Sequence, residues 1–174
     1  MTWIIRDAQT ADACACAAIY RPYVAETAIT FETQPPSEAE MAQRMATAAA
    51  THAWLVLEEQ DRVVGYAYAH AFASRAAYRW ACETSIYLER GRRRTGGGRA
   101  LYEVLFSRLV ARGFRRAIAG MTLPNEASQG LHLALGFEPV GTYRQIGWKN
   151  DAWHDVAWMQ KTLSLEPDPP EEPR

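Results

Sequence analysis

The sequence predicts an α/β or α+β fold, with one mixed β-sheet and helices on its faces. Short segments rich in apolar and β-branched residues alternate along the chain with segments whose apolar residues recur at helical spacing. Their order is one strand, two helices, three strands, a helix, a strand, a helix and two strands. The length of 174 residues, 48% of them hydrophobic, fits one domain of ordinary size.

The N-terminal part is predicted to contain a strand and two helices. Trp3–Arg6 form the strand, and Thr10 begins an alanine-rich helix that weakens near Pro22. Ser37 caps the second helix, which starts with acidic residues and runs to about Thr51.

Three strands are predicted in the middle of the chain. Trp54–Leu57 and Val63–Ala71 form an antiparallel pair around a turn, and Thr84–Leu88 is the third strand. Arginines and glycines then replace hydrophobic residues over Glu89–Gly98. A helix follows, with a leucine at every fourth residue from 101 to 109.

The C-terminal part is predicted to be a strand, a short helix and a closing hairpin. The strand covers Arg115–Leu123, and the helix begins at Pro124–Glu126 and stops at Gly136. The hairpin strands cover Phe137–Arg144 and Trp153–Leu163, joined around residues 147–151. We expect one domain over residues 1–165 and a disordered acidic, proline-rich tail over 166–174, which has almost no apolar surface to bury.

Composition excludes several classes of protein. The 19 basic and 20 acidic residues give a net charge of -1, which argues against nucleic-acid binding, and no apolar run is long enough for a signal peptide or a membrane span. Cys14, Cys16 and Cys82 cannot all pair within one chain, so a disulfide scaffold is not expected and the cytoplasm is the predicted compartment. The histidines show no metal-ligand spacing with the cysteines, and no metal is expected.

The segment Arg92–Arg99 lies between a strand and a helix. Glycines there let backbone N–H groups approach a phosphate, and a helix N-terminus adds partial positive charge. No Lys-Ser or Lys-Thr pair follows the last glycine, which excludes a Walker A loop, and Leu101 replaces the third glycine of a dinucleotide fingerprint. A solvated surface turn and, with less support, a nucleic-acid patch are the alternatives to pyrophosphate binding.

The loop Arg93-Arg94-Thr95-Gly96-Gly97-Gly98 resembles the Arg/Gln-x-x-Gly-x-Gly motif of the GNAT superfamily of N-acetyltransferases, which holds the pyrophosphate of acetyl-CoA. Further stretches along nearly the whole chain are similar to its phosphinothricin and methionine sulfoximine acetyltransferase branch. They are Thr30–Thr33, Arg75–Tyr87, Leu123–His132 with Leu135–Phe137, and Gly147–Lys149 with Trp153–Val156. The resemblance implies a mainly antiparallel sheet of about seven strands with helices on both faces.

The resemblance implies that Glu83 is the general base and that His132 assists, by protonating the coenzyme A thiolate or by helping the base through water. A base is needed because a primary ammonium, with a pKa of about 10.4, is mostly charged at neutral pH. Burial in its apolar segment would raise the pKa of Glu83 toward a useful range, although an ion pair with a nearby arginine is the alternative. For His132 the alternative is a packed, hydrogen-bonded side chain.

The resemblance also implies the binding residues. Acetyl-CoA contacts fall on the glycine loop, on main-chain groups of a strand and on the start of a helix: Arg93, Arg94, Thr95, Gly96, Gly97, Gly98, Arg99, Ile86, Tyr87, Leu88, Asn125 and Ser128. Helix capping is the ordinary explanation for Asn125.

The implied acceptor contacts are the aromatic wall Phe31 and the loop residues Arg75, Tyr78 and Arg79, since arginine suits small anions. A solvated loop is the alternative for both arginines. Glu32 departs from the arginine of some phosphinothricin enzymes and would repel an anionic phosphinate if it faced the site.

These residues predict an acetyl-CoA-dependent N-acetyltransferase acting on the α-amine of a small amino acid or analogue. Direct attack in a ternary complex is expected, since Cys82 has no convincing base partner for a covalent intermediate. The alternatives are a protein or peptide N-acetyltransferase and a non-catalytic acyl-CoA-binding domain. A homodimer is expected from the family, with Trp148, Trp153 and Trp158 at its interface or in the core.

Overall fold

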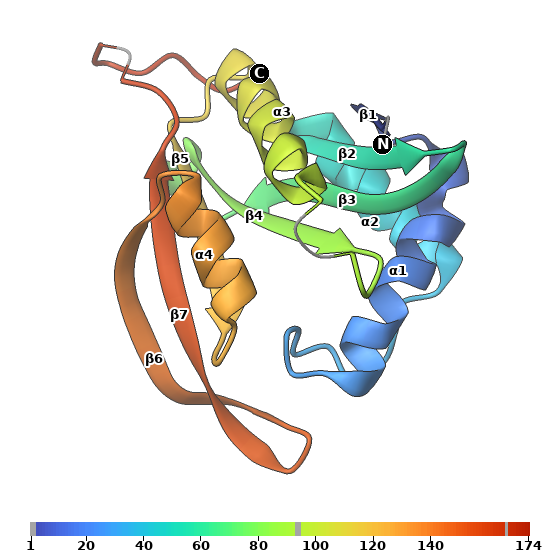
Figure 1. The fold of residues 1–174 in the computed structure, drawn as a ribbon. Helices are drawn as coiled ribbons and strands as arrows, with labels where there is room; N and C mark the ends of the chain where they lie inside the picture. Colours follow the sequence, from blue (N-terminus) through green and yellow to red (C-terminus); the bar gives the residue numbers. More distant parts are fainter. Residues whose placement is uncertain (1–2, 93–94, 166) are drawn as a thin grey trace.

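A mixed sheet organises the computed structural model, which describes residues 3–92, 95–165 and 167–174 (Figure 1). Its strands are β1 (Trp3–Asp7), β2 (Ala53–Glu59), β3 (Arg62–Ala71), β4 (Ala81–Leu88), β5 (Arg116–Thr122), β6 (Glu138–Lys149) and β7 (Ala152–Thr162). Its helices are α1 (Ala13–Glu26), α2 (Glu38–Thr51), α3 (Gly97–Ala111) and α4 (Glu126–Ala134), with short 3-10 turns at Thr10–Asp12 and Ala76–Tyr78. The strand order is β1-β2-β3-β4-β5-β7-β6. Only β4 and β5 pair in parallel among these strands, which confirms the predicted fold class.

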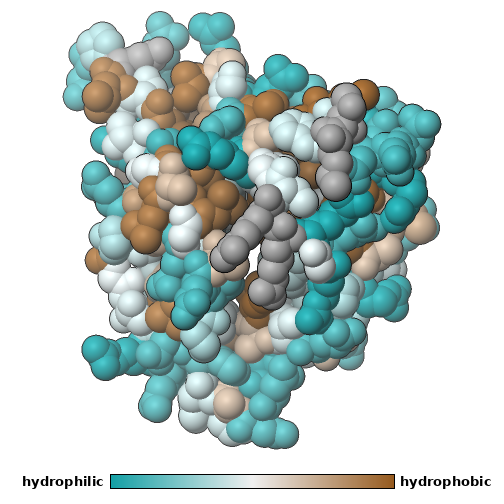
Figure 2. Space-filling view, in the orientation of Figure 1, coloured by the Kyte–Doolittle hydropathy of each residue, from teal (hydrophilic) through white to brown (hydrophobic). Residues whose placement is uncertain are grey.

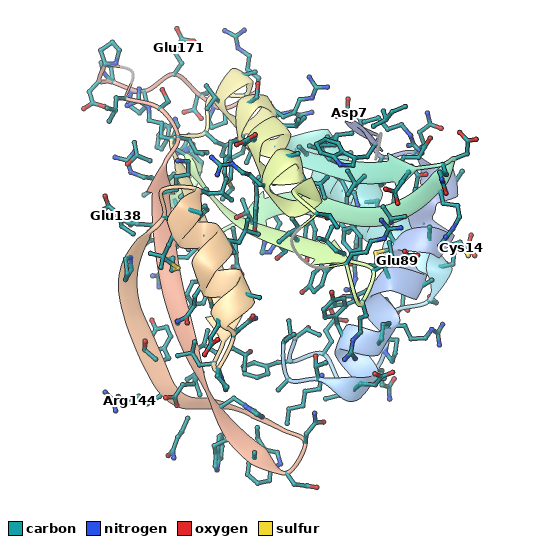
Figure 3. All side chains as sticks on the ribbon, in the orientation of Figure 1. Asp7, Cys14, Glu89, Glu138, Arg144 and Glu171 are labelled. Carbon is teal, nitrogen blue, oxygen red and sulfur yellow. The ribbon has the colours of Figure 1, made fainter. Side chains whose placement is uncertain are left out.

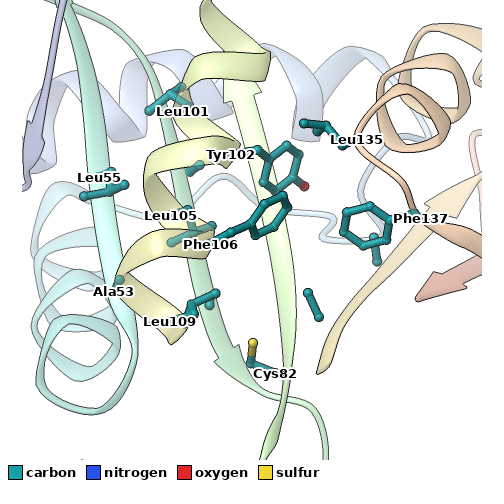
Figure 4. Close-up of a cluster of buried hydrophobic side chains, with 14 of the residues drawn as sticks. Ala53, Leu55, Cys82, Leu101, Tyr102, Leu105, Phe106, Leu109, Leu135 and Phe137 are labelled. Carbon is teal, nitrogen blue, oxygen red and sulfur yellow. The ribbon is translucent and has the colours of Figure 1, made fainter. Parts of the chain in front are cut away.

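Helices cover both faces of the sheet because successive strand residues point to opposite sides. In β2, Trp54 and Val56 join the core beneath α1 and α2, whereas Leu55 and Leu57 join the core beneath α3. The α3 side contains stacked aromatic rings, including Tyr102, and extends to the start of β6 (Figure 4).

Helix α1 continues through Pro22 to Glu26, so the predicted weakening near Pro22 is wrong. Proline lacks the N–H that would bond to the preceding turn. Tyr20 and Val24 on either side of it are buried, and this packing outweighs the missing hydrogen bond.

The cap of α2 is confirmed by reciprocal hydrogen bonds. The Ser37 hydroxyl accepts from the Glu40 N–H at 3.2 Å, and the Glu40 carboxylate accepts from the Ser37 N–H at 2.7 Å. These bonds satisfy donors that the first helical turn leaves free.

The C-terminal hairpin is longer than predicted. Strand β6 continues to Lys149, and Asn150 and Asp151 alone form the turn, with φ of 52° and 57°. Gly147 is therefore a strand residue and not part of the turn. Its missing side chain leaves room for the Phe31 ring, since an added Cβ would lie 2.2 Å from Phe31 Cε2.

The end of the chain lies near the C-terminus of α3 (Figure 1). The Trp80 indole N–H donates to the Glu171 carbonyl at 2.7 Å, and the Arg174 N–H donates to the Arg112 carbonyl at 2.9 Å. Residues 167–174 make these contacts although composition predicts disorder, and Glu166 lies outside the described residues. Across the described ranges, no helix is both long and apolar enough to cross a membrane.

Candidate active site

A gap opens where β4 and β5 part. Their parallel pairing runs only from Ala81 opposite Arg116 to Glu83 opposite Ile118, although β4 continues to Leu88. The Glu89 N–H bonds to the Val64 carbonyl of β3, and antiparallel bonding alternates along a strand. The main-chain groups of Ile86 consequently face the gap. The Leu88 carbonyl also faces away from β3 and accepts a hydrogen bond from the Tyr23 hydroxyl at 2.7 Å.

The glycine loop meets this gap at the N-terminus of α3. Gly96 caps the helix with φ of 81°, a conformation that favours glycine. Gly97 and Gly98 are buried, and an added Cβ on Gly97 would lie 2.7 Å from Leu57 Cδ2. The first-turn N–H groups of α3 have no partners within the helix, so this end can bind phosphate oxygens.

Other loop residues have different surroundings. Thr95 is exposed, and its hydroxyl accepts weakly from the Gly97 N–H at 3.5 Å, while Arg99 pairs with Glu103 one turn along α3. Arg93 and Arg94, both predicted to contact the cofactor, lie outside the described residues. Tyr87 points to the α1 face, where its ring packs against Tyr20 and Tyr23.

A cavity of about 480 Å³ lies beside the gap and contains Glu83 in its wall. Its lining comes from α1 and the loop after it, from β3, β4 and β5, and from the C-terminal hairpin: Tyr20, Ile29, Thr30, Phe31, Glu32, Tyr68, His70, Glu83, Ser85, Tyr87, Gly120, Met121, Thr122, Tyr143, Ile146, Val156 and Trp158. Burial raises the pKa of Glu83, opposed by the positive charge of His70. A carboxylate with a raised pKa in such a cavity suits a general base.

The cavity wall that carries Phe31 is held by Lys149, a residue for which the sequence predicts no site role. The buried Lys149 ammonium donates to the carbonyls of Val24 at 2.7 Å, Thr30 at 2.8 Å and Glu32 at 2.7 Å. It thereby joins the end of α1 and the Phe31 loop to the end of β6.

Glu32 lines the cavity, but a partner balances its charge. The Arg44 guanidinium binds both carboxylate oxygens, at 2.7 and 3.0 Å, and the Tyr20 hydroxyl donates to the same carboxylate at 3.0 Å. Burial raises the pKa of Glu32, but the hydrogen bonds from Arg44 and Tyr20 outweigh it and hold this pKa below its usual value. The pair therefore adds no net negative charge to the cavity.

His132 lies outside this cavity wall, on the α3 side of the sheet. Its Nδ1–H donates to the Ser128 carbonyl at 2.7 Å, which leaves Nε2 to accept from the Tyr102 hydroxyl at 3.1 Å. Burial lowers the pKa of His132, opposed by the bond to the Ser128 carbonyl. Because both ring nitrogens have protein partners and Phe137 packs edge-on against the ring, the geometry favours the packed-histidine interpretation.

Asn125 and Ser128 form the cap of α4. The Asn125 side-chain oxygen accepts from the Ser128 N–H at 3.2 Å, as the capping interpretation predicts. Gly98 lies near this helix, since its added Cβ would be 3.6 Å from Leu131 Cδ2. Thus α4 packs beside the start of α3 through Leu131.

The structure does not bring Arg75, Tyr78 and Arg79 to the cavity wall. They lie in an exposed segment, and Arg79 donates to the Ala76 carbonyl at 2.7 Å and pairs with Glu172 at 2.6 Å. Arg75 is the residue before the 3-10 turn, and Tyr78 contacts Phe72 edge-on with the ring centroids 5.7 Å apart.

Sequence reasoning missed His70, which lines the cavity from β3 directly opposite Glu83 on β4. The alternation of Tyr66, Tyr68 and His70 puts all three on one face of a strand, but only the pairing of β3 with β4 brings His70 to Glu83.

A covalent route through Cys82 has no structural support. The Cys82 thiol is fully buried on the α3 side, and burial raises its pKa to about 12. In the part of the chain that the structure describes, no group of three or more His, Cys, Asp or Glu side chains is arranged to hold a metal ion.

Known proteins resemble this chain over nearly its full length. Residues 5–158 match the family model described as an acetyltransferase (GNAT) domain. The phosphinothricin N-acetyltransferase of Streptomyces viridochromogenes is 36% identical over 166 residues, covering 95% of this chain and 90% of the relative. The L-methionine sulfoximine/L-methionine sulfone acetyltransferase of Pseudomonas paraeruginosa is 34% identical over 172 residues, covering 96% and 97%. The crystal structure of a phosphinothricin acetyltransferase from Sinorhizobium meliloti in complex with acetyl-CoA superposes with a TM-score of 0.90 at 41% identity, covering 98% of this chain and 96% of that one.

Proposed function

Because the chain belongs to the GNAT acetyltransferase family, we propose that this acetyl-CoA-dependent N-acetyltransferase acetylates the α-amine of a small amino acid or amino-acid analogue. The observation that carries the proposal is the partly buried Glu83 carboxylate in a cavity of about 480 Å³, at the inner end of the gap between β4 and β5. A cavity of this volume suits a small acceptor. The names of the relatives direct the choice to acceptors of the phosphinothricin, methionine sulfoximine and methionine sulfone type.

Acetyl-CoA fits the glycine-loop end of the gap. The first turn of α3 offers N–H groups and the positive end of the helix dipole to the pyrophosphate, with Thr95–Arg99 around them. The main-chain groups of Ile86 offer hydrogen bonds to the pantetheine arm, in the segment Ile86–Leu88. When bound, acetyl-CoA supplies the acetyl thioester.

We also propose that residues 1–165 form one acetyltransferase domain.

Glu83 acts as the general base and takes a proton from the ammonium of the acceptor, which frees the nitrogen lone pair for direct attack in a ternary complex. The high pKa of Cys82 supports a route without a covalent acetyl-enzyme. His132 is assigned to fixing α4 against Tyr102, since both of its ring nitrogens are occupied by protein groups.

Acceptor recognition rests on Phe31 and the surrounding cavity wall, and not on the loop of Arg75, Tyr78 and Arg79. The Arg44 partner of Glu32 removes the net negative charge that would oppose an anionic head group. Anionic analogues therefore stay among the proposed substrates.

A second copy of the chain is the proposed partner. The hairpin of β6 and β7 exposes Tyr143, Ile146, Trp148 and Trp153, each by more than half of its surface. A homodimer would cover this apolar surface, and light scattering after size-exclusion chromatography measures it. We propose a cytoplasmic location, with which the free cysteines agree. We propose no nucleic-acid or membrane partner.

The test is acetyl-CoA-dependent release of free thiol across phosphinothricin, methionine sulfoximine, methionine sulfone, common amino acids, polyamines and short peptides. We expect saturable turnover with a small amino-acid analogue. Turnover with peptides only, or tight acetyl-CoA binding without any turnover, would overturn the small-acceptor proposal.

Glu83→Gln tests the base within the same assay. We expect kcat to fall by about 10²- to 10⁴-fold, the usual contribution of a general base, while acetyl-CoA binding stays within twofold. Glu138→Gln is the matched control, because Glu138 lies on the outer strand β6, away from the gap (Figure 3). Equal activity of the two variants would refute the role of Glu83.

A further inference from the structure

We propose that His70 is a positioning residue that acts through Glu83. His70 accepts the proton from the Glu83 carboxyl group and passes it to water in a second cavity. This inference rests on the proposed role of Glu83. It concerns the route by which that proton leaves the site after it has been taken from the acceptor.

The reaction requires such a route. Converting an ammonium and a thioester into an amide and a thiol removes two protons from nitrogen, and only one of them is kept, on the thiol sulfur. One proton per turnover must therefore reach solvent. Glu83 is partly buried, and while it holds this proton it cannot serve as base again.

His70 stands next to Glu83 in the sheet. The two residues are direct partners in the antiparallel pairing of β3 with β4, so their side chains share one face. Residues directly opposite each other have Cβ atoms only about 5 Å apart. A carboxyl group and an imidazole on such a pair are within reach directly or through one water.

The hydrogen bonding of His70 leaves the correct nitrogen available. His70 Nδ1 lies 3.1 Å from the Ala71 carbonyl oxygen, which can only accept, so Nδ1 carries the proton. In the neutral ring Nε2 then has its lone pair, and among the described residues no hydrogen bond to it is recorded. Nε2 is the atom that can take the proton from Glu83.

His70 also borders both cavities. The second cavity, about 510 Å³ in volume, lies between α2 and the sheet and is lined by His70 and Tyr68, which also line the first. Its other walls are Gln43, Arg44, Thr47, Ala48, Thr51, His52, Trp54 and Ala71. Water there can receive the proton from the imidazolium and return His70 to its neutral form.

Several other charged and titratable groups surround the pair. Tyr20 of α1, Tyr87 of β4 and Tyr143 of β6 line the first cavity. The Glu32–Arg44 ion pair lies on the α1 and α2 side, Tyr68 is on the same face of β3, and His52 faces the second cavity. On the α3 side, burial raises the pKa of Tyr102, and the negative charge of Glu83 adds to this rise. Burial lowers the pKa of His52 to about 4, so His52 is neutral above pH 6 and does not compete for the proton.

The experiment is His70→Gln, measured as kcat and kcat/KM against pH with the best acceptor from the panel. Glutamine keeps hydrogen bonding but carries no proton. We expect kcat at pH 7 to fall by about 10²-fold, the lower end of general acid–base effects, with partial recovery in added imidazole. We also expect the acidic limb of kcat/KM to move to higher pH, since the positive charge that favours the Glu83 carboxylate is lost.

His52→Gln is the matched control, because it removes an imidazole from the same second cavity without removing a charge in the assay range. His70→Asn replaces His70→Gln if thermal unfolding shows that the glutamine variant does not fold. As a readout independent of turnover, the carbon-13 NMR titration of the Glu83 carboxyl group should shift to higher pH in the His70 variant and stay in place in the control.

The outcomes separate this inference from the proposed function. If Glu83→Gln abolishes turnover while the His70 variant keeps the native pH profile and gains nothing from imidazole, the relay is refuted and the base assignment stands. If Glu83→Gln keeps full turnover, the base assignment and the relay both fail. Loss in the single variants without further loss in the double variant supports the relay, because the two residues then act in one path.

Discussion

Replacing Lys149 by methionine tests whether the C-terminal hairpin holds the cavity wall that carries Phe31 in place. The ammonium donates to three carbonyl groups, of Val24, Thr30 and Glu32, at 2.7 to 2.8 Å. Hydrogen bonds to charged groups contribute about 1.5–3 kcal/mol each, and methionine avoids the cost of burying a charge, which offsets part of their loss. We therefore expect the free energy of unfolding to fall by roughly 3 kcal/mol.

For a domain of this size, a loss of that magnitude lowers Tm by about 6–12 °C in a thermal unfolding experiment followed by circular dichroism. The loop that carries Phe31 also loses its anchor, so KM for the acceptor should rise by about tenfold, equivalent to about 1.4 kcal/mol. Acetyl-CoA binding at the glycine loop should not change, since Lys149 bonds to the end of α1 and the Phe31 loop and not to the start of α3.

The chain's other lysine provides the control. The Lys161 ammonium donates to one carbonyl, that of Leu135, at 2.7 Å, and lies 5.8 Å from the centre of the Phe106 ring. Lys161→Met should therefore cost a fraction of the stability that Lys149→Met costs and leave KM for the acceptor unchanged. Equal losses of Tm, or an unchanged acceptor KM in Lys149→Met, would refute the anchoring role.

Gly147→Ala should raise KM for the acceptor by about three- to tenfold, because the new Cβ would overlap the Phe31 ring. The control is Gly141→Ala on the same strand, whose Cβ would meet no atom within 4 Å and which should behave as wild type in the same kinetics. Since burial raises the pKa of Glu83 and the base must be ionised, kcat/KM should rise with pH through a limb above the ordinary glutamate pKa of about 4.3; a limb at or below that value in the pH profile would contradict the assignment. The Cys82 thiol, buried and with its pKa raised to about 12, should react with iodoacetamide only after unfolding, and labelling of the folded protein seen by mass spectrometry would show that it is accessible.

Most of the fold follows from local signals in the sequence. The Ser37 cap and the glycine at the end of α4 define helix ends, and alternation defines the hairpin of β2 and β3. The differences arise where distant segments decide the structure. Strand β4 begins at Ala81, three residues earlier than predicted, because Ala81–Glu83 pair with β5. Gly147 belongs to β6 because it pairs with His154 of β7, and Phe31 from a distant loop lies against it.

The candidate site shows the same contrast between local signals and contacts made by distant segments. The apolar segment around Glu83 and the family resemblance at Glu83 and Phe31 predicted site residues, and the structure has both in the cavity wall. His70 could not be found without the pairing of β3 with β4, and the anchoring by Lys149 joins segments more than a hundred residues apart. The arginines at 75 and 79 have a residue type that suits an anion, but residue type does not specify where a loop points.

The exposed surface is mainly hydrophilic on the side shown in Figure 2, with smaller apolar patches between the polar groups. Such a distribution is ordinary for a protein surface.

The short parallel contact between β4 and β5 divides the sheet into two plates, one from β1 to β4 and one from β5 to β6. The plates meet only over Ala81–Glu83 and Arg116–Ile118 in the strand pairing. Beyond these residues the two plates have no strand pairing, so the space between them opens from Glu83 toward the glycine-loop end of β4. Glu83 is thus the last residue of β4 that pairs with a strand on each side, with His70 of β3 and with Ile118 of β5. The sheet itself therefore fixes the main chain of this carboxylate, while the rest of β4 keeps one edge free for hydrogen bonds to another molecule.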